Sequence, residues 1–334
     1  LQLLMQNVDK NQLQQQLSDM KLDNKDLQKD LERTIELFKQ MEFEQKLQDN
    51  IDKLNELAKK QDELSKKSDD KTSDSKDIKQ EQDSLNKNFD DFRKDMDDLA
   101  KKNEDLEAKK DLANTDEQEQ DIQKDMENSS DQLEQKKNSK AAKSQKNASE
   151  KMDQLAQKMN KMKEEMEKEE NEEDMDALRA LLENLLHLSF DQEQTMQNLK
   201  TIDINNPQYL KLSQQQRKLK DDAKMIEDSL FALSKRVMQI EAKVNQEISA
   251  INLNMDEALK DLEDRLVPQA RSRQQFVMTS VNNLTLMLSE SLQQMMQKES
   301  NSNSNCNKPG KKKSSSLSQL RKMQEELNKN MKKA

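Results

Sequence analysis

Hydrophobic residues recur along most of the chain at the three- and four-residue spacing that is typical of α-helices. They are densest in residues 177–190, ALRALLENLLHLSF, where nine of fourteen residues are apolar although the whole chain is only 31% hydrophobic. A stripe this wide is broader than one coiled-coil seam and needs several neighbouring helices. We therefore expect this segment to be the root of a helical bundle. Its large apolar side chains are Leu178, Leu181, Leu182, Leu185, Leu186 and Phe190.

A polar interval at residues 65–77 interrupts the first long hydrophobic pattern, which begins near residue 31. The interval has no hydrophobic residue and is rich in Ser, Asp and Lys, a composition that favours a loop. Leu64 and Ile78, however, are two heptads apart, so the heptad phase is the same on both sides. This spacing favours one long helical arm with a local interruption over the alternative of two helices that fold back on each other.

A turn is predicted near residues 113–117, where the hydrophobic seam becomes polar. Thr115 and Gln118 have the spacing of a capping box, which would begin a returning helix. Residues 31–200 are therefore predicted to form a long antiparallel coiled-coil hairpin that protrudes from an elongated bundle, with its root at 177–200. The seam of this hairpin would contain Leu85, Phe89, Phe92, Met96, Leu99, Met152, Leu155, Met159, Met162 and Met166.

The predicted turn also sets the pairing of the two arms. With the turn centred near residue 115, antiparallel pairing brings residues 38–43 opposite residues 187–192. Phe38, Met41 and Phe43 would then complete the bundle root. The hydrophobic parts of both arms would meet at the root, and their polar parts would meet towards the tip.

The remaining segments predict smaller elements. Residues 201–298 predict two further bundle helices with a break at Pro268, because proline ends or kinks a helix. Residues 1–30 form a weak N-terminal helical pattern. Residues 299–316 are low in complexity and predict a disordered linker, and residues 317–334 predict a short amphipathic helix.

Composition restricts the fold class and the partners. One Gly and three Pro in 334 residues leave almost no material for the turns of a β-sheet, so we expect an all-α protein. The net charge of -10 argues against a nucleic-acid partner, because contacts with phosphates need clustered basic residues. No apolar run is long enough to span a bilayer, so any membrane anchor is expected outside this segment of the protein.

The residues that usually carry catalysis are scarce. The single Gly excludes a P-loop and a dinucleotide-binding loop, and the single His, His187, excludes a ferritin-like di-iron site. We therefore expect a protein that is not an enzyme and has no catalytic residue, metal, cofactor or small-molecule substrate. Met159, Met162 and Met166 fall on seam positions, where methionine is usually a core residue and not a copper ligand.

Five segments carry a resemblance to a known family: residues 39–65, 139–152, 177–196, 216–236 and 274–290. They include ALRALLENLLHLSFDQEQTM and QQFVMTSVNNLTLMLSE. These segments resemble the Bacteroidota proteins grouped as domain of unknown function 4175, and the resemblance extends from about residue 31 to residue 334. It implies a helical portion, on the periplasmic side of the inner membrane, of a large envelope protein with N-terminal membrane helices. It implies no catalytic residue.

Two functional hypotheses follow. The first is a structural or interaction protein of the bacterial cell envelope that presents a coiled-coil arm to protein partners in a membrane-associated complex, with self-association left open. The alternative is a chaperone-like or translocon-associated periplasmic factor that holds unfolded clients. Burial of Met159, Met162 and Met166 would favour the first hypothesis, and their exposure would favour the second.

Overall fold

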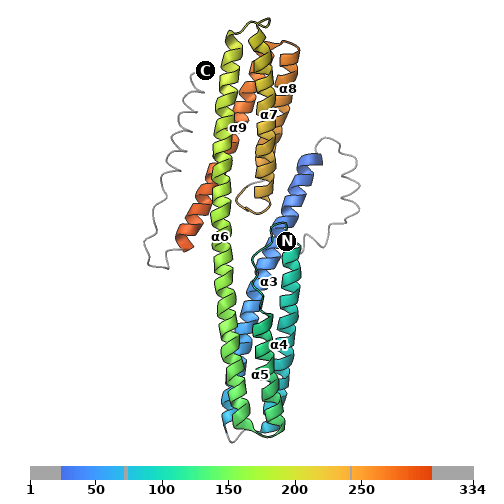
Figure 1. Cartoon of the computed structure of the whole chain (residues 1–334), viewed down its shortest axis with the longest axis vertical. Helices are drawn as coiled ribbons and strands as arrows, with labels where there is room; N and C mark the ends of the chain where they lie inside the picture. The colour runs from blue at the N-terminus through green and yellow to red at the C-terminus, as the bar shows by residue number, and fades with distance from the viewer. Residues whose placement is uncertain (1–23, 71–73, 241–242, 303–334) are drawn as a thin grey trace. The chain divides into compact units, whose positions relative to one another are not determined.

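The computed structural model describes residues 24–70, 74–240 and 243–302, which form helices and no strand (Figure 1). The predicted all-α class is confirmed. The predicted segments at residues 1–23 and 303–334, including most of the linker and the final amphipathic helix, lie outside the described residues. The helices are α3 (Asn24–Asp69), α4 (Ser75–Glu104), α5 (Asp116–Glu134), α6 (Asn138–Thr201), α7 (Pro207–Ser234), α8 (Lys243–Glu263) and α9 (Val267–Ser302).

The chain divides into two compact units, and α3 and α6 each contribute residues to both. We call residues 36–170 the first bundle. The described residues 24–35 and 171–302 are the second bundle. Each bundle has its own hydrophobic core, and each is built from four long antiparallel helical segments.

In the first bundle the helices follow one another up and down, and the last one closes against the first. The segments are the end of α3, then α4, α5 and the start of α6 (Figure 1). One contact illustrates each neighbouring pair: Lys53 with Asp95 at 2.7 Å, Asn86 with Ser130 at 2.9 Å, Lys151 with Asp125 at 2.7 Å, and the Ser149 hydroxyl with the Ala58 carbonyl at 2.9 Å.

The predicted long arm is wrong, because the polar interval at residues 65–77 contains a true reversal of the chain. Helix α3 ends at Asp69, and the Asp74 side chain caps the start of α4 by accepting a hydrogen bond from the Lys76 backbone at 2.9 Å. The two helices then pack side by side. This is the alternative that the sequence favoured less, in which two helices fold back on each other. The heptad phase is preserved because both helices supply apolar residues to the same core.

A second reversal at residues 135–137 was not predicted. Lys136 adopts a left-handed conformation with φ 57°. The Lys136 N–H donates to Leu133 at 2.9 Å and the Lys137 N–H donates to Gln132 at 2.8 Å, which is the Schellman pattern of a helix end. The predicted hairpin is thus replaced by a four-helix bundle whose α4–α5 connection contains the predicted turn near residue 115.

The second bundle contains the end of α6 followed by α7, α8 and α9. Residues 201–298 therefore hold three helices and not the predicted two, because residues 235–242 separate α7 from α8. A helix end does occur beside Pro268, which lies in the first turn of α9 where its missing N–H is tolerated. The first turns of α3 pack against α7 and α8: the Asn245 amide donates to Asp30 at 2.5 Å.

The predicted root is also wrong in one respect, because its members belong to different cores. Phe43 is buried in the first core, whereas Leu178 and Leu185 are buried in the second. Met41 is 46% exposed and Phe190 is 37% exposed. The predicted pairing failed because it assumed one turn between the two arms, where the chain makes three.

Candidate interaction surface

The two bundles share the geometry of their third turn. Arg265, between α8 and α9, has φ 59° and is the counterpart of Lys136. The Arg265 N–H donates to Leu262 at 3.1 Å and the Leu266 N–H donates to Asp261 at 2.7 Å, which repeats the Schellman pattern of the first bundle. Lys136 and Arg265 are 129 residues apart. Each residue of α8 and α9 is therefore equivalent to the residue 129 positions earlier, which lies in or next to α5, or in the start of α6.

A buried glutamine layer in each core supports the same correspondence. In the first bundle Gln61 and Gln82 form a reciprocal pair, at 2.7 and 3.2 Å, and the Gln145 amide donates to the Gln82 oxygen at 3.0 Å. In the second bundle Gln192 and Gln216 form the reciprocal pair, both at 2.8 Å. The Gln274 amide donates to the Gln216 oxygen at 2.7 Å.

These layers place one glutamine on the first, second and fourth helix of each bundle, and all six side chains are buried. The third helix supplies the small residues Ser129 and Ala258, which are also buried. Even the unpartnered atom is the same, because the Oε1 atoms of Gln145 and Gln274 have no donor among the described residues. The two bundles are therefore equivalent helix by helix.

Burial along the first helix of each bundle follows the same pattern. Aligning Gln61 with Gln192 pairs residues that are buried in both helices: Ile51 with Leu182, Leu54 with Leu185, Leu57 with Leu188, Ala58 with Ser189, Leu64 with Thr195, and Ser68 with Leu199. The interiors thus follow one plan. Differences in function are expected where the equivalent surfaces diverge.

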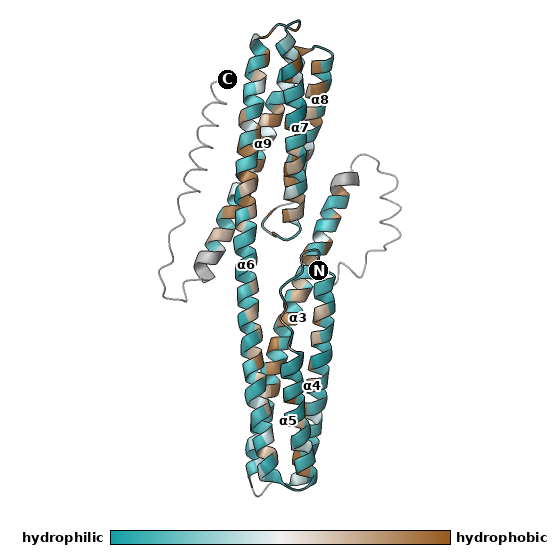
Figure 2. Ribbon diagram, in the orientation of Figure 1, coloured by the Kyte–Doolittle hydropathy of each residue, from teal (hydrophilic) through white to brown (hydrophobic). Residues whose placement is uncertain are grey.

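The surfaces diverge in hydrophobicity. Among the described residues, the strongly exposed large hydrophobic side chains other than Met41 all belong to the second bundle. Seven of them have a polar or charged equivalent in the first bundle: Phe190 with Lys59, Leu210 with Lys76, Met225 with Asp91, Leu253 with Lys124, Leu266 with Lys137, Phe276 with Asn147, and Leu286 with Gln157. Figure 2 shows the contrast between α8 and α9, which carry much brown, and α4 and α5, which are mostly teal.

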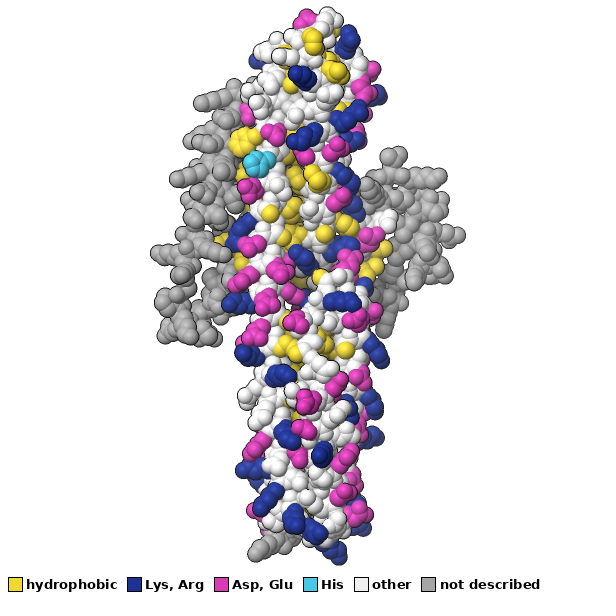
Figure 3. All heavy atoms as spheres, in the orientation of Figure 1, with side chains coloured by type: hydrophobic (Ala, Val, Ile, Leu, Met, Phe, Trp, Pro, Cys, Tyr) yellow, Lys and Arg dark blue, Asp and Glu magenta, His cyan; other side chains and the backbone are white. Residues whose placement is uncertain are grey.

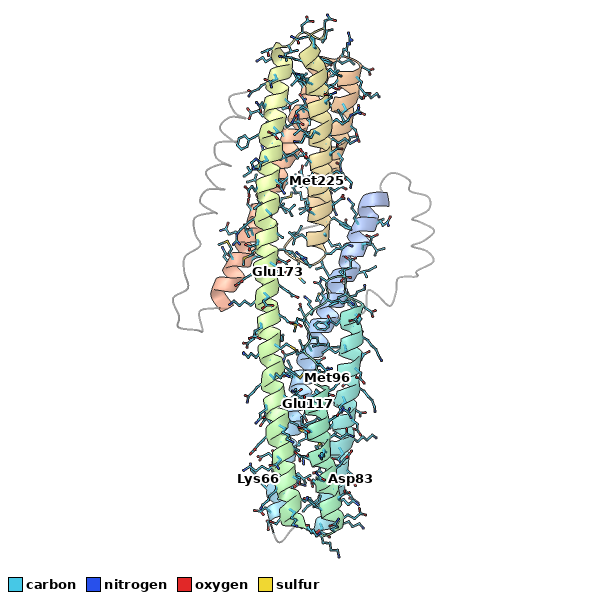
Figure 4. The ribbon with its side chains drawn as sticks, in the orientation of Figure 1. Lys66, Asp83, Met96, Glu117, Glu173 and Met225 are labelled. Atoms are coloured by element: carbon cyan, nitrogen blue, oxygen red, sulfur yellow. The ribbon has the colours of Figure 1, made fainter. Side chains whose placement is uncertain are left out.

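Met225 and Leu253 are among the most exposed hydrophobic residues of the second bundle, at 62% and 61%. They lie at the same level of the antiparallel helices α7 and α8, because the nearby Asn252 amide donates to Glu227 at 2.9 Å. Met225 lies two residues before Glu227, on the other side of α7, so the two side chains are separate apolar positions. Figure 4 labels Met225 on α7, and Figure 3 shows hydrophobic side chains between the charged ones on the face of the second bundle in view. We call these two residues, Met225 and Leu253, the α7–α8 pair.

A buried ion cluster around Glu227 holds the first turns of α3 against α7. Burial alone would raise the pKa of Glu227, but hydrogen bonds from Lys29, Asn252 and Lys224 lower it to about 2. The Lys29 ammonium also lies 5.4 Å from the centre of the Phe231 ring. Lys29 thus contacts both Glu227 and the Phe231 ring of α7, and these two contacts fix the first turns of α3 on the surface of α7.

Arg33 continues this attachment one turn further along α3. Its Nε donates to the Ser234 carbonyl at 3.0 Å, and its Nη2 donates to the Ile240 carbonyl. Ser234 is the last residue of α7, where carbonyls lack a partner within the helix, and Ile240 lies in the connection to α8, so Arg33 joins the end of α7 to this connection. Burial lowers the pKa of Arg33, and Asp30 opposes that effect.

The predicted seam residues lie inside the first bundle, although their helices pair differently from the prediction. Met159 is fully buried, and Met162 and Met166 are partly buried against the first core. The Met162 sulfur accepts a contact from the Ala113 backbone N–H at 3.2 Å. By the criterion of methionine burial, this favours an interaction protein over a client-holding chaperone.

His187 lies on the outer face of α6 in the second bundle. Its side chain is 73% exposed, and its Nε2 is 3.9 Å from Glu183. Sequence reasoning identified the hydrophobic root around His187 but missed the glutamine layers and the Glu227 cluster. The glutamines could have been recognised as polar residues at core positions, whereas the Glu227 cluster depends on packing between α3 and α7.

The searches of the described residues for a metal site and a membrane-spanning helix, and the search for related proteins, were all negative. Among the described residues, no group of three or more His, Cys, Asp or Glu side chains could hold a metal ion. Over the same residues, no helix has the length and hydropathy needed to cross a membrane. Comparison with protein-family models, curated proteins and solved structures gives no match.

Proposed function

We propose that this protein is a non-enzymatic structural and interaction protein. In this proposal the first bundle is a charged helical scaffold, and the second bundle presents apolar side chains to protein partners. The observation that carries the proposal is the systematic replacement of Lys, Asp and other polar residues on the first bundle by Phe, Leu and Met at equivalent positions on the second. Exposed apolar residues concentrated on one module are typical of a protein-binding surface.

A binding role explains the exposed apolar residues of the second bundle better than chance does. Exposed apolar residues are common on soluble proteins when they are scattered singly. Here both bundles have equivalent cores, so the same fold tolerates polar residues at all seven positions. The apolar side chains of the second bundle are therefore unnecessary for folding, and a binding role explains their presence.

The cellular setting of the proposal rests on the family resemblance. That resemblance supports a place on the periplasmic side of the inner membrane, within a membrane-associated complex of the cell envelope. The alternative of a chaperone-like or translocon-associated factor draws its support from the many methionines of the chain. Among these methionines, Met225 supports that alternative because it is 62% exposed.

Site-specific photocrosslinking in living cells tests the proposal. A photoreactive amino acid would replace Met225 or Leu253, and matched variants would carry it at the equivalent Asp91 or Lys124. We expect discrete adducts with one or a few envelope proteins from the second bundle, and none from the first. Equal capture from both bundles would contradict the proposal. A broad smear of newly made chains would favour the chaperone-like alternative.

A further inference from the structure

The outer face of α9 is free of charge over an unusual length. Residues 274–289 contain no charged residue, although 37% of the whole chain is charged. The equivalent stretch of the first bundle, residues 145–160 of α6, carries charges at Lys146, Glu150, Lys151, Asp153 and Lys158. The fold of this helix therefore permits charges, and their absence from α9 needs another explanation.

Two exposed apolar side chains lie on this neutral face. Phe276 is 54% exposed and Leu286 is 45% exposed, and they replace Asn147 and Gln157 of the first bundle. Ten residues of helix separate them by about 15 Å. Thr279 and Asn283 are exposed between them, so the face offers two apolar anchors with short polar side chains in the middle.

The neutral face is symmetric about its own centre. Phe276 and Leu286 are centred on residue 281. The charges that end the stretch, the basic Arg273 and the acidic Glu290, are centred between residues 281 and 282, half a residue away. Neither Arg273 nor Glu290 forms an ion pair with another described residue. Such an arrangement is complementary to itself when a second copy lies antiparallel across it.

We propose that α9 is the interface of a homodimer in which two copies pair antiparallel about a two-fold axis at residues 281–282. Phe276 of each copy packs against Leu286 of the other. Arg273 of each copy forms an ion pair with Glu290 of the other at both ends of the contact. The neutral stretch between these pairs can be removed from water without burying an unpaired charge.

A second copy explains these features better than an unrelated partner does. An unrelated helix could match the two apolar anchors, but it would not require that opposite charges stand at equal distances from the centre. The α7–α8 pair has no comparable symmetry and remains available for other proteins. The dimer therefore goes beyond the proposed scaffold role, and either proposal can fail without the other.

The interface is one helix face from each copy, so its affinity is expected to be modest. We expect a monomer–dimer equilibrium with a dissociation constant in roughly the micromolar range. Sedimentation velocity of the full chain, at protein concentrations from about one-tenth to ten times the dissociation constant, measures this equilibrium directly. A monomer throughout this range would overturn the proposal and would leave the face to a different protein.

Charge reversal tests the pairing across the axis. Arg273→Glu brings two carboxylates together at both ends, and Glu290→Arg brings two guanidinium groups together, so each variant alone should dimerise at least about tenfold more weakly. An equimolar mixture of the two variants restores opposite charges at both ends. Recovery of the dimer in the mixture is the expected result, and no recovery would contradict the antiparallel arrangement.

The first bundle provides the control substitutions. The double variant Phe276→Asn with Leu286→Gln adopts the residues of the equivalent α6 face, so it should fold and remain monomeric. The double variant Met225→Asp with Leu253→Lys makes the same kind of change at the α7–α8 pair and should dimerise like the wild type. Loss of the dimer in this second variant, with helix content unchanged by circular dichroism, would place the interface elsewhere and overturn the proposal.

Discussion

Lys136 and Arg265 hold the same left-handed backbone conformation, with φ 57° and 59°, at the same point of two equivalent helix ends. Glycine is the usual residue at this position, because a side chain in the left-handed region costs about 1 kcal/mol. Both turns therefore form without the residue that favours them. The hydrogen bonds that close each turn and the packing of the adjoining helices compensate for this cost.

Glycine at either turn is expected to stabilise the protein. Lys136→Gly or Arg265→Gly should raise the free energy of unfolding by about 0.5 to 1 kcal/mol, because the native backbone would no longer strain a side chain. Urea unfolding followed by circular dichroism measures the change. Lys124→Gly, in the middle of α5, is the control and should lower the free energy by about 1 kcal/mol. Destabilisation by glycine at both turns would contradict the left-handed assignment.

The Glu227 cluster predicts a strong effect from a small substitution. Glu227→Gln keeps an acceptor oxygen but removes the negative charge that Lys29 and Lys224 share, so these cations lose their buried counter-ion. We expect a loss of unfolding free energy on the order of 2 kcal/mol at neutral pH. The exposed Asp228 pairs with Lys224 at 2.8 Å and is the matched control. Asp228→Asn should cost less than about 0.5 kcal/mol.

The same cluster predicts a pH dependence. The pKa of Glu227 falls from its ordinary value of 4.5 to about 2 in the folded protein, so the folded state binds the proton more weakly than the unfolded state does. The stabilisation is complete above pH 4.5 and is lost as the pH falls towards 2. The difference in unfolding free energy between wild type and Glu227→Gln should therefore shrink over this window. A difference that stays constant from pH 7 to pH 3 would contradict the low pKa.

The glutamine layers predict opposite effects of single and combined changes. Gln82→Leu leaves the donors of Gln61, Gln145 and Ser129 without this acceptor in the buried core, so a loss of about 2 to 3 kcal/mol is expected. Gln216→Leu should cost a similar amount in the second bundle. Replacing all three glutamines, Gln61, Gln82 and Gln145, by leucine leaves only the Ser129 donor without an acceptor. This triple variant should recover most of the stability that Gln82→Leu loses. Thermal unfolding of the four proteins tests the layers.

The pattern of hydrophobic residues predicted the helices well but their pairing poorly. The buried positions of α4 and α6, such as Phe89, Phe92 and Met159, were assigned correctly from heptad spacing. Their partners were not, because heptad spacing states which face of a helix is buried and carries no information on which helix covers it. Leu64 and Ile78 kept one phase across a reversal of the chain, so phase continuity was misleading evidence for a straight arm.

The turns were difficult for a different reason. The reversal after α5 has Lys136 where a glycine would have marked it, and a charged residue carries no turn signal. The step from Leu133 to Ala141 departs from the three- and four-residue spacing and was the available clue. The proposed role of the second-bundle surface could not be inferred from either bundle alone. It required the helix-by-helix equivalence, which depends on contacts such as Gln82 with Gln145.

The contact of Arg33 with the end of α7 predicts a local effect of its removal. Arg33→Ala deprives the carbonyls of Ser234 and Ile240 of their donor, and the connection between α7 and α8 loses its attachment to α3. We expect amide hydrogens at residues 234–240 to exchange with solvent about tenfold faster, which corresponds to roughly 1.4 kcal/mol of local stability. Arg33→Lys keeps one charge but cannot reach both carbonyls with a planar group, so it should restore only part of the protection.

Hydrogen exchange measured by mass spectrometry separates these cases, with Lys102→Ala in the first bundle as a control that leaves this region unchanged. Uniform acceleration across the whole second bundle would instead show that Arg33 supports the entire unit and not the α7–α8 connection.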